Sequence, residues 1–112
     1  MVSNSDLEKL VNLVHGYIGK TIKVDESISR SRDVGHHDRH FSTHTYFTFT
    51  VENVMVAFSG AQLTILGTNA RYGISLDSVV SFRNEEGLEI VEHFEKQTER
   101  QTLITITGAK NA

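Results

Sequence analysis

The chain has 112 residues and a formal net charge of -3 when its six histidines are neutral. This length suits one domain with a single hydrophobic core, and an acidic balance disfavours nucleic-acid binding, which needs many clustered cations. Cysteine is absent, which excludes disulfides, thiolate metal sites and a cysteine nucleophile. Charged residues interrupt the apolar pattern of the N-terminus, and no later apolar run is long enough to cross a membrane. We therefore expect a soluble, cytoplasmic protein without a membrane partner.

The first predicted element is a helix over about residues 4–15, because four apolar residues have the spacing of one helical stripe: Leu7, Leu10, Val11 and Val14. Ser3 and Ser5 compete as its N-cap. The first would allow a hydrophobic staple and the second has capping-box spacing. Gly16 is the expected end of the helix, since glycine accepts the left-handed conformation that closes many helices.

The remaining sequence predicts strands over about residues 18–25 and 43–107. Phe47, Phe49 and Val51 alternate with polar residues, so one face of that strand should be buried. A turn or bulge is expected at residues 52–53 before the next strand. Residues 84–100 are ambiguous, because their apolar residues fit either a turn and strand, which we favour, or a helical stripe. A last strand is predicted over about residues 102–107.

These elements predict a mainly β domain, either a small antiparallel barrel or a strongly bent sheet, with the helix packed on one end or on an open face. The chain contains no proline, so its strand edges must be protected by charge, bulges, closure or pairing with another subunit. The order of elements, with a strand, a tight turn and a strand over residues 74–82, resembles small SH3-like or Sm-like barrels in outline. A resemblance of topology alone implies no function.

The most unusual segment is polar and covers about residues 26–43. It is rich in histidine and arginine and has no apolar periodicity, so we expect a long loop or a hairpin excursion from the β body. Packing gives no reason for this composition. We favour a non-enzymatic binding or assembly module that recognises a protein partner, or associates with itself, through this excursion and an adjacent sheet edge. The candidate residues are Arg30, Arg32, His36, His37, Arg39, His40 and His44.

Two alternatives use subsets of the same residues. His36, His40 and His44 are spaced by four, so a helix or a folded-back loop would let them share a metal ion, whereas an extended strand would separate them too far. This would make the chain a metal-binding protein or a metal-dependent enzyme. The second alternative is a small anionic ligand held by three arginines: Arg30, Arg32 and Arg39.

No cofactor or catalytic residue is assigned from the sequence. A glycine-rich phosphate loop is missing, and the segment at residues 73–77 lacks the last glycine of a nucleophile elbow. Five glutamates follow residue 84, and we interpret them as a solvated face of a hairpin or helix: Glu85, Glu86, Glu89, Glu92 and Glu95.

Overall fold

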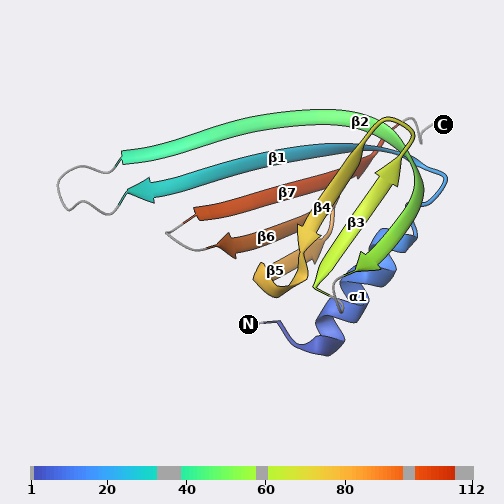
Figure 1. Cartoon of the computed structure of the whole chain (residues 1–112), viewed down its shortest axis with the longest axis horizontal. Helices are drawn as coiled ribbons and strands as arrows, with labels where there is room; N and C mark the ends of the chain where they lie inside the picture. Colours follow the sequence, from blue (N-terminus) through green and yellow to red (C-terminus); the bar gives the residue numbers. More distant parts are fainter. Residues whose placement is uncertain (1, 33–38, 58–60, 95–97, 108–112) are drawn as a thin grey trace.

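The computed structural model describes residues 2–32, 39–57, 61–94 and 98–107, with residues 30–32 and 39–42 described by their backbone alone. Within these residues, one helix precedes seven antiparallel strands, and a short 3-10 helix lies between two of them (Figure 1). The strands form one sheet in the order β4-β3-β2-β1-β7-β6-β5. The elements are α1 (Asn4–His15), β1 (Thr21–Arg32), β2 (Arg39–Ala57), β3 (Gln62–Gly67), β4 (Arg71–Ser75), η1 (Leu76–Ser78), β5 (Val79–Asn84), β6 (Leu88–Phe94) and β7 (Thr98–Ile106).

The predicted N-terminal helix is confirmed, and Ser3 is its N-cap. The Ser3 hydroxyl accepts from the Asp6 backbone N–H, and the Asp6 carboxylate accepts from the Ser3 N–H, so two otherwise unpaired donors are satisfied. Gly16 ends the helix but is right-handed, with φ of -65°. The left-handed residue is Gly19, with φ of 89°, where the chain turns into β1.

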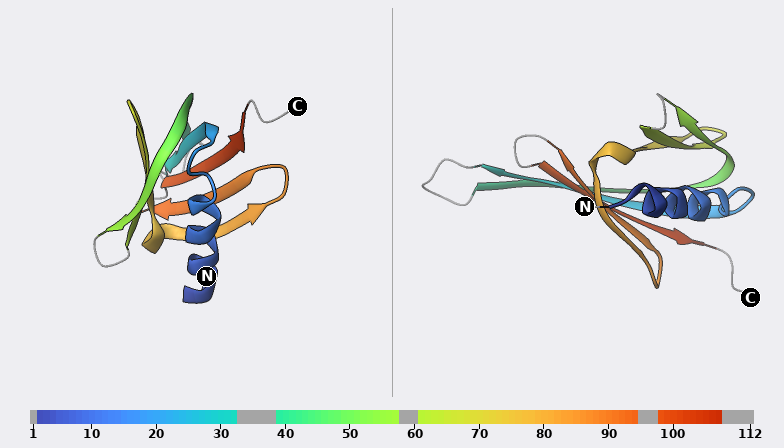
Figure 2. Two further views of the ribbon diagram at one scale, coloured as in Figure 1. Left: turned by 90° about the vertical axis from the view of Figure 1, so that its right-hand side faces the viewer. Right: turned by 90° about the horizontal axis from the view of Figure 1, so that it is seen from below.

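The long strand β2 bends the sheet into two layers. Its 19 residues pair with β1 in the first part and with β3 from Val51 onward, and the register shifts between Val51 and Asn53. Such a bulge bends a strand, because one extra residue is left outside the ladder. In both views of Figure 2, α1 lies between the β3–β4 layer and the layer of β1, β7, β6 and β5. The helix contributes two fully buried side chains to the core, Leu10 and Val14.

Of the two predicted shapes, the structure has the strongly bent sheet and is not closed into a barrel. The strands β4 and β5 are the two ends of the sheet order, although only η1 separates them in the chain. No pairing joins them in the part of the chain that the structure describes. The core fills the inside of the bend, with alternate strand residues fully buried: Ile22, Val24, Leu63, Ile65, Ile74, Leu88, Ile90 and Ile104.

The polar segment is a paired hairpin where the structure describes it. β1 continues to Arg32 and β2 begins at Arg39, and the two pair in register from Thr21 opposite Thr50 to Arg32 opposite Arg39. The loop alternative is therefore wrong for residues 26–32 and 39–43, whereas residues 33–38 lie outside the described residues. Residues 28–32 and 39–43, which we call the arm, extend this hairpin on the side away from α1 (Figure 1), and Ile28 to Arg30 also pair with β7.

Two further ambiguities in the predicted elements are resolved. Residues 88–94 form β6, so the helical alternative for this segment is wrong. The predicted turn or bulge at residues 52–53 is a bulge within one continuous strand.

Candidate functional site

The inner face of the sheet carries charged side chains at positions where the strand pattern would place apolar ones. Glu92 on β6 has the same alternation as Leu88 and Ile90, and its side chain is fully buried. Arg100 on β7 has the same alternation as Ile104. Because alternate residues of a strand point to the same face, both charges are directed into the space beneath β4.

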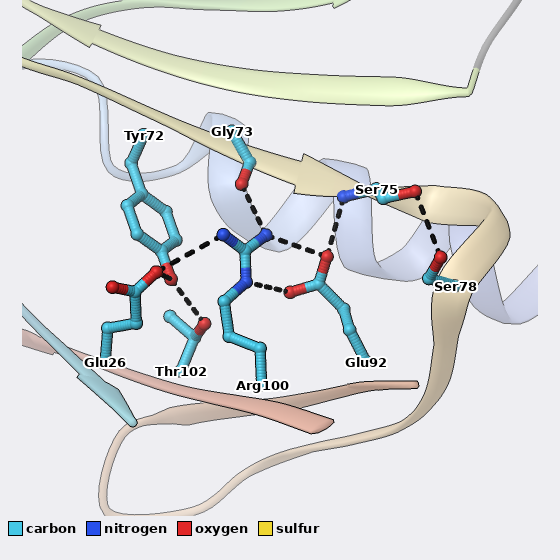
Figure 3. Close-up of polar contacts among 8 residues, drawn as sticks. All are labelled: Glu26, Tyr72, Gly73, Ser75, Ser78, Glu92, Arg100 and Thr102. Atoms are coloured by element: carbon cyan, nitrogen blue, oxygen red, sulfur yellow. Dashed lines mark hydrogen bonds and ion pairs between the residues drawn. The ribbon is translucent and has the colours of Figure 1, made fainter. Parts of the chain in front are cut away.

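Glu92 and Arg100 form a bidentate ion pair that also binds the backbone of β4 (Figure 3). Arg100 Nε donates to Glu92 Oε1 at 2.7 Å, and Nη2 donates to Oε2 at 2.8 Å. Nη2 also donates to the carbonyl oxygen of Gly73 at 2.7 Å, and the Ser75 N–H donates to Glu92 Oε2 at 2.8 Å. Alternate residues of an antiparallel strand direct their backbone groups to the same side. The ion pair thus occupies the edge of β4 that faces away from β3.

A second set of hydrogen bonds extends this network to β1. The Tyr72 hydroxyl donates to Glu26 Oε2 at 3.1 Å and accepts from the Thr102 hydroxyl at 2.7 Å. Arg100 Nη1 lies 3.3 Å from the same Glu26 oxygen. The network therefore connects β4 with β1, β6 and β7 through side chains.

Burial and neighbouring groups shift the pKa values of Tyr72 and Arg100. Burial raises the pKa of the Tyr72 phenol well above its ordinary value, so this group is neutral at physiological pH. Burial of the Arg100 guanidinium opposes its charge. The hydrogen bonds and charge of Glu92, with smaller contributions from Tyr72 and Glu26, outweigh that effect and hold the pKa of Arg100 above its ordinary value. Neither Tyr72 nor Arg100 is poised to move a proton near neutral pH, which fits a structural role for these two residues.

The second notable feature is the edge of β2. Over residues 43–49, which we call the β2 edge, the strand pairs with β1 on one side, whereas β3 begins its pairing only at Val51. Val51 directs its backbone groups toward β1, since it bonds with Gly19 and Lys20. Odd-numbered residues of this strand therefore face β1, and even-numbered residues direct their N–H and carbonyl groups to the open side: His44, Tyr46 and Thr48.

The side chains on the outer face of the β2 edge are arranged around Tyr46, which is 61% exposed. The His44 ring stacks on it with 6.0 Å between centroids, and Lys23 Nζ lies 5.0 Å from the centroid of the phenol ring. His44 Nε2 in turn lies 2.5 Å from Asp25 Oδ1. An exposed aromatic ring is thus held between two neighbouring side chains.

Most of the candidate residues from the sequence lie in the arm. The register places Arg32 opposite Arg39, Ser31 opposite His40 and Arg30 opposite Phe41. Their side chains lie outside the described part of the chain, as do His36 and His37 entirely. Of the seven candidates, the structure describes the side chain of His44 alone, and it belongs to the outer face of the β2 edge.

The metal and anion hypotheses stay predictions. His40 and His44 belong to one extended strand, roughly 13 Å apart at about 3.3 Å per residue, so the helical spacing that favours a shared ion does not occur between them. Among the residues with described side chains, no three His, Asp or Glu groups are placed to hold a metal. His36 and the side chains of the three arginines lie outside the described part of the chain, so the structure tests neither the metal site nor the anion site.

A groove of about 660 Å³ lies between α1, β2 and η1. It is lined by Asn4, Leu7, Glu8, Val11, Asn12, Val56 and Leu76. Only Glu8 among these residues is titratable, so the lining offers no pair of groups for acid–base chemistry.

Sequence reasoning missed the buried network. The five glutamates were interpreted as one solvated face, but the fully buried Glu92 differs from the others that are described. The available signal was its alternation with Leu88 and Ile90, which places residue 92 on the buried face of a strand.

Comparison of the chain with protein-family models, with curated proteins and with solved structures finds no match. Within the described residues, no helix has both the length and the apolar character required to cross a bilayer.

Proposed function

We propose that the protein is a non-enzymatic protein-binding or assembly module that engages its partner through the β2 edge and the adjacent arm. The observation that carries this proposal is the β2 edge itself, where three residues direct backbone donors and acceptors away from the sheet. An extended segment of another chain can pair with such an edge, and its main-chain hydrogen bonds then supply much of the affinity.

The other sheet edges support this choice because each has protection that is not found at the β2 edge among the described residues. Glu92 and Arg100 bind the backbone of β4 at Ser75 and Gly73. The edge strand β5 is short, and its register with β6 shifts between Val79 and Ser81. Bulges and covered backbone groups both discourage the addition of a strand. Residues 43–49 contain no proline, lysine, arginine or carboxylate.

The arm adds a pair of strands with a polar sequence next to this edge. It continues the β1–β2 pairing to Arg32 and Arg39. Its sequence is rich in arginine and histidine, residue types that can donate hydrogen bonds to a partner.

The decisive substitution is Thr48→Pro, with Thr48→Ala as the matched control. The Thr48 N–H faces the open side, so proline removes a donor from the edge without removing a bond to β1. Alanine keeps that donor. A second variant replaces residues 31–40 with an Asn-Gly turn and shortens the arm.

Tagged wild-type chain is used to isolate partners from its cell of origin, and each specific partner is identified by mass spectrometry, purified and titrated by calorimetry. We expect Thr48→Pro to weaken binding at least about tenfold and Thr48→Ala to leave it unchanged. The proposal is wrong if every purified partner binds the proline and shortened-arm variants as tightly as wild type. It is equally wrong if the chain retains no specific protein, its own copies included.

A further inference from the structure

We propose that the occupant of the β2 edge is β2 of a second copy of this chain, paired antiparallel about a two-fold axis at Tyr46. This inference rests on the proposed function and names its partner. The pairing would join two bent sheets into one continuous sheet with the same surface used by both copies, which is the arrangement of a two-fold dimer.

The outward backbone groups of the β2 edge are symmetric about Tyr46. In the two-fold arrangement, Tyr46 lies opposite Tyr46 of the second copy, and His44 lies opposite Thr48 of the second copy. Because all of these residues direct both backbone groups to the open side, about six inter-copy hydrogen bonds can form. The pairing ends before Val51, where β3 takes over the edge. The bulge that follows Val51 turns β2 and β3 away from the line of the added strand.

The charges around the edge also suit a second copy. Lys23 lies opposite Thr48 in the β1–β2 register, and Asp25 lies opposite Tyr46. The two-fold axis sets Thr48 opposite His44 of the second copy, so Lys23, Thr48 and that histidine lie in one line across the strands. Within each copy, His44 is paired with Asp25. Asp25 and its equivalent are separated by three strand spacings, roughly 14 Å, which exceeds the screening length of about 8 Å at physiological ionic strength.

Tyr46 gives the symmetric pairing its specificity. Its ring is held between His44 and Lys23 and is exposed by 61%. Pairing about this residue brings two such rings side by side, and aromatic pairs opposite one another stabilise sheets. A foreign strand could use the same backbone groups, but the segment has no lysine, arginine or carboxylate and is centred on one pre-positioned tyrosine, so it matches its own copy.

Disulfide trapping tests the register directly, because the chain has no cysteine of its own. An equimolar mixture of His44→Cys and Thr48→Cys should cross-link under mild oxidation, since opposite residues of a hydrogen-bonded pair have Cα atoms about 5.5 Å apart, within the range of a disulfide. Each variant alone should stay uncross-linked, because its two cysteines would be separated by roughly 13 Å along the strands. A mixture of His44→Cys with Met55→Cys is the control and should not cross-link.

Analytical ultracentrifugation from about 1 µM to about 500 µM measures the assembly itself. We expect wild type to form a dimer, and its dissociation constant should rise at least about tenfold in Thr48→Pro and in Tyr46→Lys. The lysine variant keeps every backbone donor but sets two like charges opposite each other at the two-fold axis. Met55→Lys, on the same strand beyond the bulge, should dimerise as wild type does. Circular dichroism identifies any variant that fails to fold, and the other variant then decides.

A wild-type chain that is monomeric at every concentration overturns this inference. So does a dimer that persists in both edge variants and gives no 44–48 cross-link, because its interface then lies elsewhere. If the chain is monomeric but a purified partner binds wild type and loses affinity with Thr48→Pro, the proposed function stands and the second copy is excluded as its partner.

Discussion

The β4 edge and the β2 edge differ in how their outward backbone donors and acceptors are covered. Both present backbone donors and acceptors at the border of an open, bent sheet. At β4, a buried ion pair binds the Gly73 carbonyl and the Ser75 N–H, whereas over residues 43–49 no described strand pairs with the outer side of β2. The comparison indicates that an unclosed sheet can protect one edge with side chains, while another edge has no described strand beside it.

The two charges at the β4 edge are paired with each other and with backbone groups of β4. Taking a carboxylate and a guanidinium out of water is costly unless each polar atom finds a partner. Glu92 uses both carboxylate oxygens on Arg100 and adds the Ser75 N–H, and Arg100 uses three nitrogens. Loss of either residue should therefore cost far more than loss of an exposed pair.

The largest effect is expected for Glu92→Ala. Removing this carboxylate leaves a partly buried guanidinium without its principal partner and the Ser75 N–H unsatisfied, which should lower the free energy of unfolding by about 3–5 kcal/mol. Urea denaturation followed by circular dichroism measures the change. Glu89→Ala on the same strand is the control, and it should shift stability by no more than about 0.5 kcal/mol because that side chain is 41% exposed. Equal losses for the two variants would show that the pair does not stabilise the β4 edge.

An intermediate effect is expected at alkaline pH. Burial raises the folded-state pKa of Tyr72 above the ordinary tyrosine value of about 10, so the unfolded chain loses this proton first. The stabilisation is complete below pH 10 and decreases as the pH rises above it, by up to about 1.4 kcal/mol per pH unit. Urea titrations between pH 9 and about pH 11.5 should show this slope, and Tyr72→Phe should reduce it. Tyr46→Phe serves as the exposed control. If it reduces the slope as much as Tyr72→Phe does, the slope does not come from the buried Tyr72.

The sequence predicted the elements whose stability depends on apolar pattern. The α1 stripe around Leu10 and the buried alternation of Phe49 and Val51 were both recognisable, because burial leaves a periodic signal. The strands of the arm were partly hidden, since strands can pair through their backbone groups without apolar alternation among their side chains. Its polar composition therefore allowed either a loop or a hairpin.

Closure of the sheet and the buried network could not be predicted in the same way. Whether a bent sheet becomes a barrel depends on how its two edge strands are placed in space, and β4 and β5 are neighbours in sequence in either case. The partner of Glu92 was also unpredictable from spacing alone, because the β4 backbone meets Glu92 and Arg100 only after β2 has bent the sheet. The histidines gave a strong compositional signal. Of the candidate residues, however, the structure describes the side chain of His44 alone.

The smallest effect is expected for the pair of Asp25 and His44 beside the β2 edge. Its two side chains are 27% and 64% exposed, so water competes for both groups, and exposed ion pairs contribute about 0.2–1 kcal/mol. A double-mutant cycle with Asp25→Asn and His44→Ala, measured by urea denaturation at pH 6, should give a coupling energy within that range. The coupling should fall further in 1 M NaCl, where the screening length is about 3 Å. A coupling energy above about 2 kcal/mol that persists in high salt would mean that this exposed pair is coupled as strongly as a buried one. The side chains at the β2 edge and the β4 edge would then be alike, and the two edges would differ in backbone pairing alone.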